Sequence, residues 1–176
     1  LQETELFEKG IYAGVGKRSG RWLNLKTFVD SLSPSQDQKQ NLIDYSSENS
    51  RRGWLQKAST DLKTPVEILS EYFEVISENF RTDWNQGRNG FCQSNAGIAV
   101  WLRVLLKIAM KESEWKNFSE NWTRKWFTKH IGKCDHKTLK KRVPDYDGEE
   151  WKGARNESEY SAIAEFLWGQ MVGRNR

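Results

Sequence analysis

Residues 95–111 read NAGIAVWLRVLLKIAMK, and their apolar side chains would surround a helix on nearly every side. A helix that is apolar all round is typical of the centre of a globular domain. The run contains Arg103 and is shorter than the roughly 20 apolar residues that a bilayer requires. We therefore predict a buried central helix and a chain that does not span a membrane.

The helix predicted immediately before it carries the clearest local signals in the chain. Thr64 suits the N-cap, Pro65 suits the first helical position, and Glu67 completes a capping box. Apolar residues then recur at helical spacing, namely Ile68, Leu69, Tyr72, Phe73, Ile76 and Phe80. The pattern predicts an amphipathic helix that packs on the core, followed by a turn over residues 85–90.

Shorter helices are predicted on both sides of this pair. The first two cover residues 24–32, with Asn24 as the N-cap, and residues 36–45. Another begins near Ser113 and gathers aromatic residues on one narrow face that we expect to be core, namely Trp115, Phe118, Trp122 and Trp126. Residues 137–142 add a further helical turn. A last helix over residues 156–171 begins at Asn156 and faces inward with Tyr160, Ile163, Ala164, Leu167 and Trp168.

The predicted fold class is mainly α, a compact multi-helix bundle with a short extended or β segment near the N-terminus, over residues 6–16. Nine Trp, eight Phe and five Tyr compensate for a hydrophobic fraction of only 36%. We expect a single helical domain over residues 1–176, with an arm of short helices over 1–62 and the main helical core over 63–176. Because the first residue is Leu rather than Met, we expect a fragment of a longer protein.

The cysteine content indicates a reducing compartment. Cys92 and Cys134 are too few for the disulfide framework of a secreted protein. Residues 1–8 hold three acids and no apolar run, unlike a signal peptide. We expect a cytoplasmic protein with two reduced thiols.

Positive charge is concentrated in one segment. Residues 1–115 are balanced and residues 143–176 are acidic, whereas residues 116–142 carry only Glu120 and Asp135 against nine bases. These nine are Lys116, Arg124, Lys125, Lys129, Lys133, Lys137, Lys140, Lys141 and Arg142. Such a segment attracts phosphate backbones, so we predict that these residues bind DNA. The alternative is a solvated helix face, partly neutralised by the acidic loop at residues 145–150.

Other motifs are weaker. His130, Cys134 and His136 have an H-x3-C-x-H spacing, but the paired arms of a structural zinc site are missing. The glycine-rich residues 14–20 lack the phosphate-loop spacing, and residues 145–149 lack the length of a calcium loop. We expect no metal, no cofactor and no catalytic residues in this chain.

Several stretches resemble, in order, the C-terminal helical part of DGQHR-domain (DndB-like) proteins, a family that includes regulators of DNA phosphorothioation. Residues 6–11 and 25–30 are similar to its "F-x-x-x-I" segment and the helix that follows. Residues 68–84 resemble its "L-x-x-Y-F-x-x-I" helix ending before a Trp. Residues 90–105 resemble its "G-x-x-x-G-I-x-x-L-x-x-L-L" helix, and residues 156–171 fit a final helix.

The resemblance implies a bacterial protein with a role in DNA modification, defence or mobile elements. The D-G-Q-H-R motif that names the family is absent from this chain, so no residue here inherits its chemistry. The leading hypothesis is a non-catalytic helical module that assists DNA association. The alternatives are a protein–protein interaction or oligomerisation domain that acts through acidic residues 145–159, or one half of an enzyme whose catalytic residues lie upstream.

Overall fold

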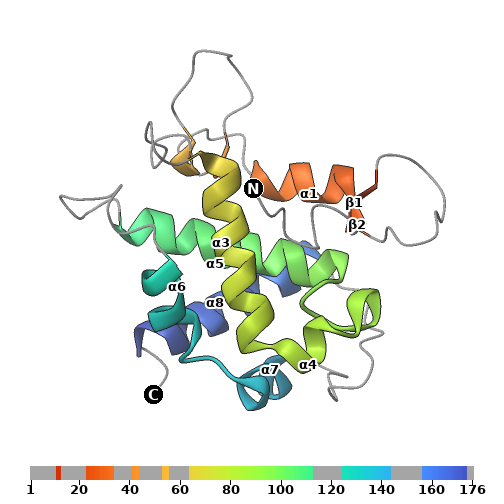
Figure 1. Ribbon diagram of the computed structural model, residues 1–176, viewed down its shortest axis with the longest axis vertical. Coiled ribbons are helices and arrows are strands. Elements are labelled where there is room, and N and C mark those ends of the chain that lie inside the picture. The colour runs from red at the N-terminus through yellow and green to blue at the C-terminus, as the bar shows by residue number, and fades with distance from the viewer. Residues whose placement is uncertain are drawn as a thin grey trace.

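The computed structural model describes residues 11–12, 23–33, 41–43, 53–55, 64–112, 124–143 and 156–173, and these ranges are mostly helical. The N-terminal part holds β1 (Ile11–Tyr12), β2 (Leu23–Asn24) and α1 (Leu25–Leu32). The larger part holds α3 (Pro65–Asn79), α4 (Arg81–Trp84), the 3-10 helix η3 (Gly87–Asn89), α5 (Asn95–Glu112), α6 (Arg124–Ile131), α7 (His136–Arg142) and α8 (Glu157–Val172) (Figure 1). Within these ranges, no helix is both long and apolar enough to cross a bilayer.

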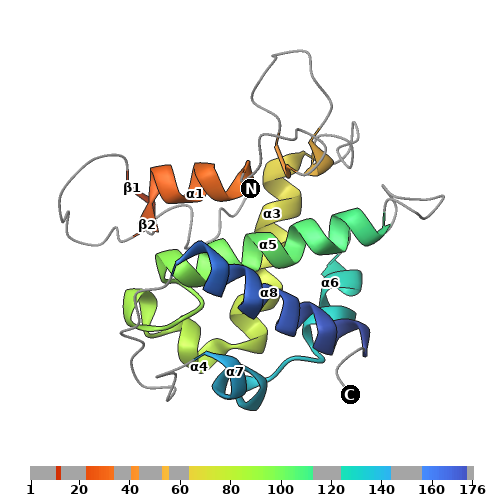
Figure 2. The same cartoon turned by 180° about the vertical axis from the view of Figure 1, so that it is seen from behind.

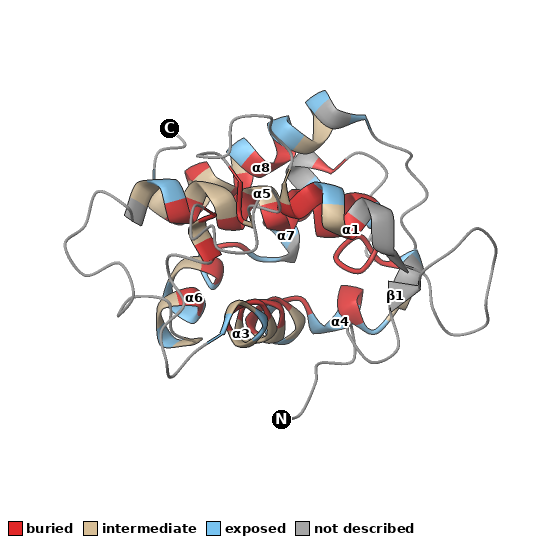
Figure 3. Cartoon of the chain, turned by 90° about the horizontal axis from the view of Figure 1, so that it is seen from above, coloured by how far each residue is buried: buried red, intermediate tan, exposed pale blue. Residues whose placement is uncertain are grey.

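The centre of the fold is α5, as its sequence predicts. One side of it is crossed by α3, and α8 lies along the opposite side (Figures 1 and 2). The Tyr72 hydroxyl of α3 donates to the Trp101 carbonyl oxygen at 2.8 Å, and the rings of Phe80 and Trp101 lie 5.4 Å apart. On the α8 side, the Arg103 guanidinium lies 5.4 Å from the centre of the Tyr160 ring. Buried residues therefore gather between the helices, as Figure 3 shows.

The predicted start and stripe of α3 are confirmed. The Thr64 hydroxyl accepts a hydrogen bond from the Glu67 backbone N–H at 3.3 Å, and the Glu67 carboxylate accepts one from the Thr64 N–H at 2.7 Å. All six residues of the stripe are buried. The last helix is confirmed as well, because the Asn156 side chain accepts from the Glu159 N–H at 3.0 Å at the start of α8.

The connection from α3 to α5 is held together by the buried side chain of Asp83. Its two carboxylate oxygens accept the backbone N–H groups of Phe91 and Cys92 at 2.9 and 2.7 Å. The chain passes so closely that a Cβ on Gly97 would lie 1.7 Å from the Phe91 carbonyl oxygen. The predicted turn over residues 85–90 is therefore part of a longer connection that also holds α4 and η3.

The helix predicted over residues 36–45 is wrong for the described residues 41–43, which are not helical. The N–H groups of Leu42 and Ile43 donate to the Leu32 carbonyl oxygen at 2.9 and 3.1 Å. The Leu55 N–H donates in turn to the Leu42 carbonyl oxygen at 2.9 Å. Backbone partners distant in the sequence therefore replace the local bonds that a helix would make.

Two other predictions fall mostly on residues that lie outside the description. Of the extended segment over residues 6–16, Ile11 and Tyr12 are described, and they pair in parallel with Leu23 and Asn24. Of the aromatic helix expected from Ser113, the structure describes only the part from Arg124 onward. The helix predicted over residues 24–32 is confirmed as α1.

Candidate nucleic-acid interface on α6 and α7

The described part of the basic segment, from residue 124 onward, folds as two short helices, α6 and α7, joined by the four residues 132–135. Its apolar residues anchor it, because the side chains of Phe127, Ile131, Cys134, Leu139 and Val143 are buried. The Phe127 ring packs edge-on against the Tyr72 ring of α3, with centroids 5.2 Å apart. The described lysine side chains between these buried residues are exposed.

Polar bonds fix the turn between the two helices. The Asp135 carboxylate accepts from the Thr138 backbone N–H at 2.8 Å and so caps α7. The side-chain amide of Asn79, at the end of α3, donates to the Cys134 carbonyl oxygen at 2.6 Å. The first bond satisfies an N–H group that the start of a helix leaves without a partner, and the second ties the turn to α3.

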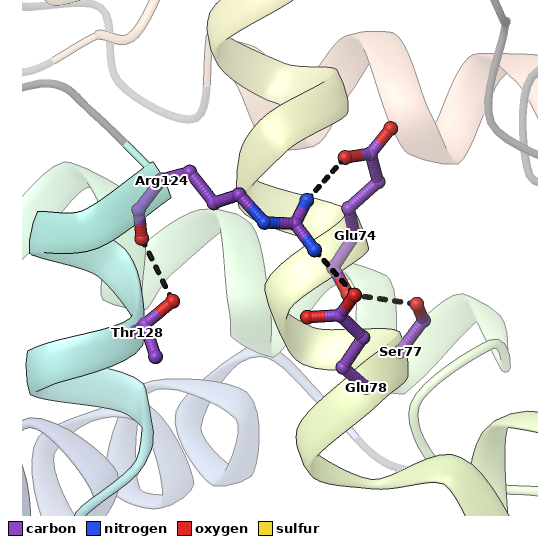
Figure 4. A network of polar contacts seen from close by, with 5 residues as sticks. All are labelled: Glu74, Ser77, Glu78, Arg124 and Thr128. Carbon is purple, nitrogen blue, oxygen red and sulfur yellow. Dashed lines mark hydrogen bonds and ion pairs between the residues drawn. The ribbon is translucent and has the colours of Figure 1, made fainter.

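Arg124, one of the nine predicted DNA-binding residues, forms ion pairs within the protein. Its guanidinium pairs with the carboxylates of Glu74 and Glu78 on α3 (Figure 4). These two acids are four residues apart and share one face of the helix, so one guanidinium can pair with both. The structure thus places Arg124 in a contact between α6 and α3 rather than among the unpaired bases.

Lys133 also has an internal partner. Its ammonium group donates to the Met171 carbonyl oxygen in the last turn of α8 at 2.7 Å. A cation near a helix C-terminus is favourable because the terminal carbonyl groups carry partial negative charge. Lys133 therefore ties the turn to α8.

Four of the nine bases remain exposed on the two helices. Lys125 and Lys129 lie on α6, and Lys137 and Lys140 lie on α7. None of the four forms an ion pair with a carboxylate that the structure describes. The pKa of the Asp135 carboxyl group is lowered mainly by its hydrogen bonds with Thr138, and the nearby charge of Lys137 adds a smaller effect. Lys116 lies outside the described residues, and so do the side chains of Lys141 and Arg142.

His130 lies beside these lysines on α6, and its pKa is lowered mainly by burial. Its ring stacks on half-buried Trp126 with centroids 3.9 Å apart, and Nδ1 lies 2.9 Å from the Trp126 carbonyl oxygen. Burial lowers the pKa of the imidazole, and the nearby charges of Lys133 and Lys129 lower it further, against the opposing effect of the Trp126 carbonyl. Trp126 also packs against the Phe127 ring, in keeping with the expected core position.

The two thiols lie in the core. The Cys134 sulfur is 3.7 Å from the Leu167 carbonyl oxygen, and burial raises the pKa of this thiol to about 12. Burial, with the charge of Asp83, also raises the pKa of Cys92 well above its ordinary value. Among the described residues, no group of three or more His, Cys, Asp or Glu side chains could hold a metal ion. The His136 side chain and residues 14–20 and 145–150 lie outside the description.

The sequence pattern missed the acceptors and donors of α3 that hold this surface in place. Glu74 and Glu78 carry a weak signal, since two acids four residues apart on one helix favour a cation between them. Asn79 carries no such signal, because its partner lies 55 residues away in the chain.

Comparisons with known proteins add no relative to this picture, because no family model, no curated protein and no solved structure matches the chain.

Proposed function

We propose that this chain is a non-catalytic helical module that assists DNA association through contacts with the phosphate backbone. The observation that supports it is the set of four exposed lysines on α6 and α7, which have no ion-pair partner in the described part of the chain. They stand on two helices that Arg124, Asn79 and Lys133 fasten to α3 and α8. The charges are therefore held on a fixed base, and none of them is in an ion pair with a carboxylate among the described residues.

The salt dependence of DNA binding to such a surface can be worked out from the number of lysines. Each phosphate neutralised on duplex DNA contributes about −0.9 to the slope of log affinity against log salt. Four lysines then give a slope of about −3.6, which corresponds to a roughly 150-fold loss of affinity between about 50 and about 200 mM salt. A steep salt dependence is therefore the signature of the proposed contact.

The biological context that fits this role is that of a bacterial DGQHR-like protein in DNA modification, defence or mobile elements. Three of the stretches that resemble that family lie on helices and the turns between them. Residues 25–30 lie on α1, residues 68–84 on α3 and α4, and residues 90–105 on α5 and the turn before it. In this context α3, α5 and α8 supply the scaffold, and α6 with α7 supplies the charge. The family would be supported by a D-G-Q-H-R motif in any sequence that precedes Leu1.

The DNA contact is tested by measuring the fluorescence anisotropy of a labelled short duplex across a salt series. We expect steep salt dependence, and loss of binding when all four lysines are replaced by glutamine. A control with the same loss of positive charge uses exposed positions on α4 and α8: Arg81→Gln, Thr82→Glu, Ser161→Glu and Ala162→Glu. This control should bind nearly as well as the unmodified chain.

Three results would overturn the proposal. The first is salt-independent or undetectable binding of DNA by the unmodified chain. The second is an equal loss of affinity in the control and in the four-lysine variant, because net charge rather than the surface would then decide. The third is an oligomer that dissociates in salt and has no affinity for DNA, which would favour the interaction domain.

A further inference from the structure

The connection between α6 and α7 has the length of the turn in a helix–turn–helix unit. Such units join two helices by three or four residues that often include glycine, and the second helix enters the major groove of DNA. Here the connection is residues 132–135. Gly132 opens it because a Cβ at this position would lie 2.7 Å from the Thr128 carbonyl oxygen. Glycine is thus required by close approach of the backbone at the start of the turn.

The two helices differ in their main packing partner. α6 packs mainly on α3 and also touches α8, whereas α7 packs on α8. α7 lies at the margin of the molecule, far from α1, in both views of the fold (Figures 1 and 2). Because Asn79 and Lys133 hold the turn, α7 needs little further ordering to meet a ligand, and such preorganisation favours affinity.

The two sides of α7 differ sharply in chemistry. Thr138 and Leu139 are buried, and Val143 directly after the helix is buried as well. Lys137 and Lys140 are exposed and lie three residues apart, so they share the outer side of the helix. The outer side is therefore basic, and the inner side belongs to the core.

We propose that α7 lies in the major groove of duplex DNA with Lys137 and Lys140 facing the base edges, while Lys125 and Lys129 of α6 contact flanking phosphates. This inference rests on the proposed DNA contact and deepens it. The major groove is about 12 Å wide and admits one helix, which is about 10–12 Å across with its side chains. Lysine donors match the O6 and N7 acceptors that guanine presents there.

Dimethyl sulfate tests this placement, because it methylates guanine N7 in the major groove. The full chain is bound to saturation on a duplex that contains guanines, and N7 protection is compared between two double variants. K137A/K140A and K125A/K129A remove the same charge from exposed positions of adjacent helices. K125A/K129A removes two phosphate contacts and should make the salt slope shallower by about 1.8, whereas K137A/K140A removes contacts with base edges and should change the slope less. At saturating protein, we expect N7 protection with the unmodified chain and with K125A/K129A, and loss of protection with K137A/K140A.

The outcomes separate this inference from the function on which it rests. Salt-dependent binding without N7 protection would overturn the groove placement and leave the backbone contact standing. Equal protection by both double variants would overturn the assignment to α7. Absence of salt-dependent binding by the unmodified chain would overturn the proposed function and this inference together. Circular dichroism of both variants, which should match that of the unmodified chain, checks that the helices remain folded.

Discussion

Replacement of Arg124 by glutamine should destabilise the fold while leaving DNA affinity almost unchanged. Its ion pairs with Glu74 and Glu78 are half-exposed, with 42% of the Arg124 side chain and 40% and 53% of the two glutamates accessible. Exposed pairs contribute about 0.2–1 kcal/mol each because solvent screens them. Leaving two acids four residues apart without their cation costs about 0.2–0.5 kcal/mol more.

The sum is a loss of about 0.6–2.5 kcal/mol in the free energy of unfolding. For a chain of this length that corresponds to a fall of about 1–10 °C in the melting temperature. Thermal unfolding followed by circular dichroism measures it. The difference in melting temperature between the variant and the unmodified chain should become smaller in high salt. At about 1 M salt the Debye length is about 3 Å, so surface ion pairs are strongly screened.

Lys125 supplies the matched control, since it is the next residue, carries the same charge and is exposed. Lys125→Gln should leave the melting temperature unchanged and lower the salt slope of DNA binding by about 0.9. Arg124→Gln should lower the melting temperature and leave the salt slope of DNA binding unchanged. If Arg124→Gln melts like the unmodified chain and weakens DNA binding as much as Lys125→Gln, then the assignment of Arg124 to the contact between α6 and α3 is refuted.

Three further predictions concern the core and the pH dependence of stability. In chemical denaturation, Gly97→Ala should lower the free energy of unfolding by about 1–3 kcal/mol, because the added Cβ would overlap the backbone. Gly173→Ala is the control and should cost less, since φ is +71° there but the space around it is open. Tyr72→Phe should cost about 1 kcal/mol in the same assay, the net value of its buried hydrogen bond to the Trp101 carbonyl oxygen; no change would mean that water replaces the bond. His130 has a pKa lowered from 6.5. The unfolded chain therefore binds more protons as the pH falls below about 6.5, so stability should decline there, and a His130→Phe variant should decline less in melting experiments at several pH values.

Local signals explain why parts of the fold were predictable from the sequence. The capping box at Thr64 involves groups three residues apart, and the apolar stripe of α3 follows from helical periodicity alone. The central place of α5 follows from a helix with no polar side wide enough to face water. The same reasoning failed at Leu42, where the backbone partner is Leu32 and lies beyond the reach of any local pattern.

The candidate site was predictable only in outline. Composition alone identified the basic segment, because an excess of lysine and arginine over acids is a property of the sequence. Only the tertiary structure distinguished Arg124 and Lys133, which pair with α3 and α8, from the lysines that remain exposed. The physical reason is that charge and helical periodicity are encoded locally, whereas the partner of a side chain depends on which distant helix packs beside it.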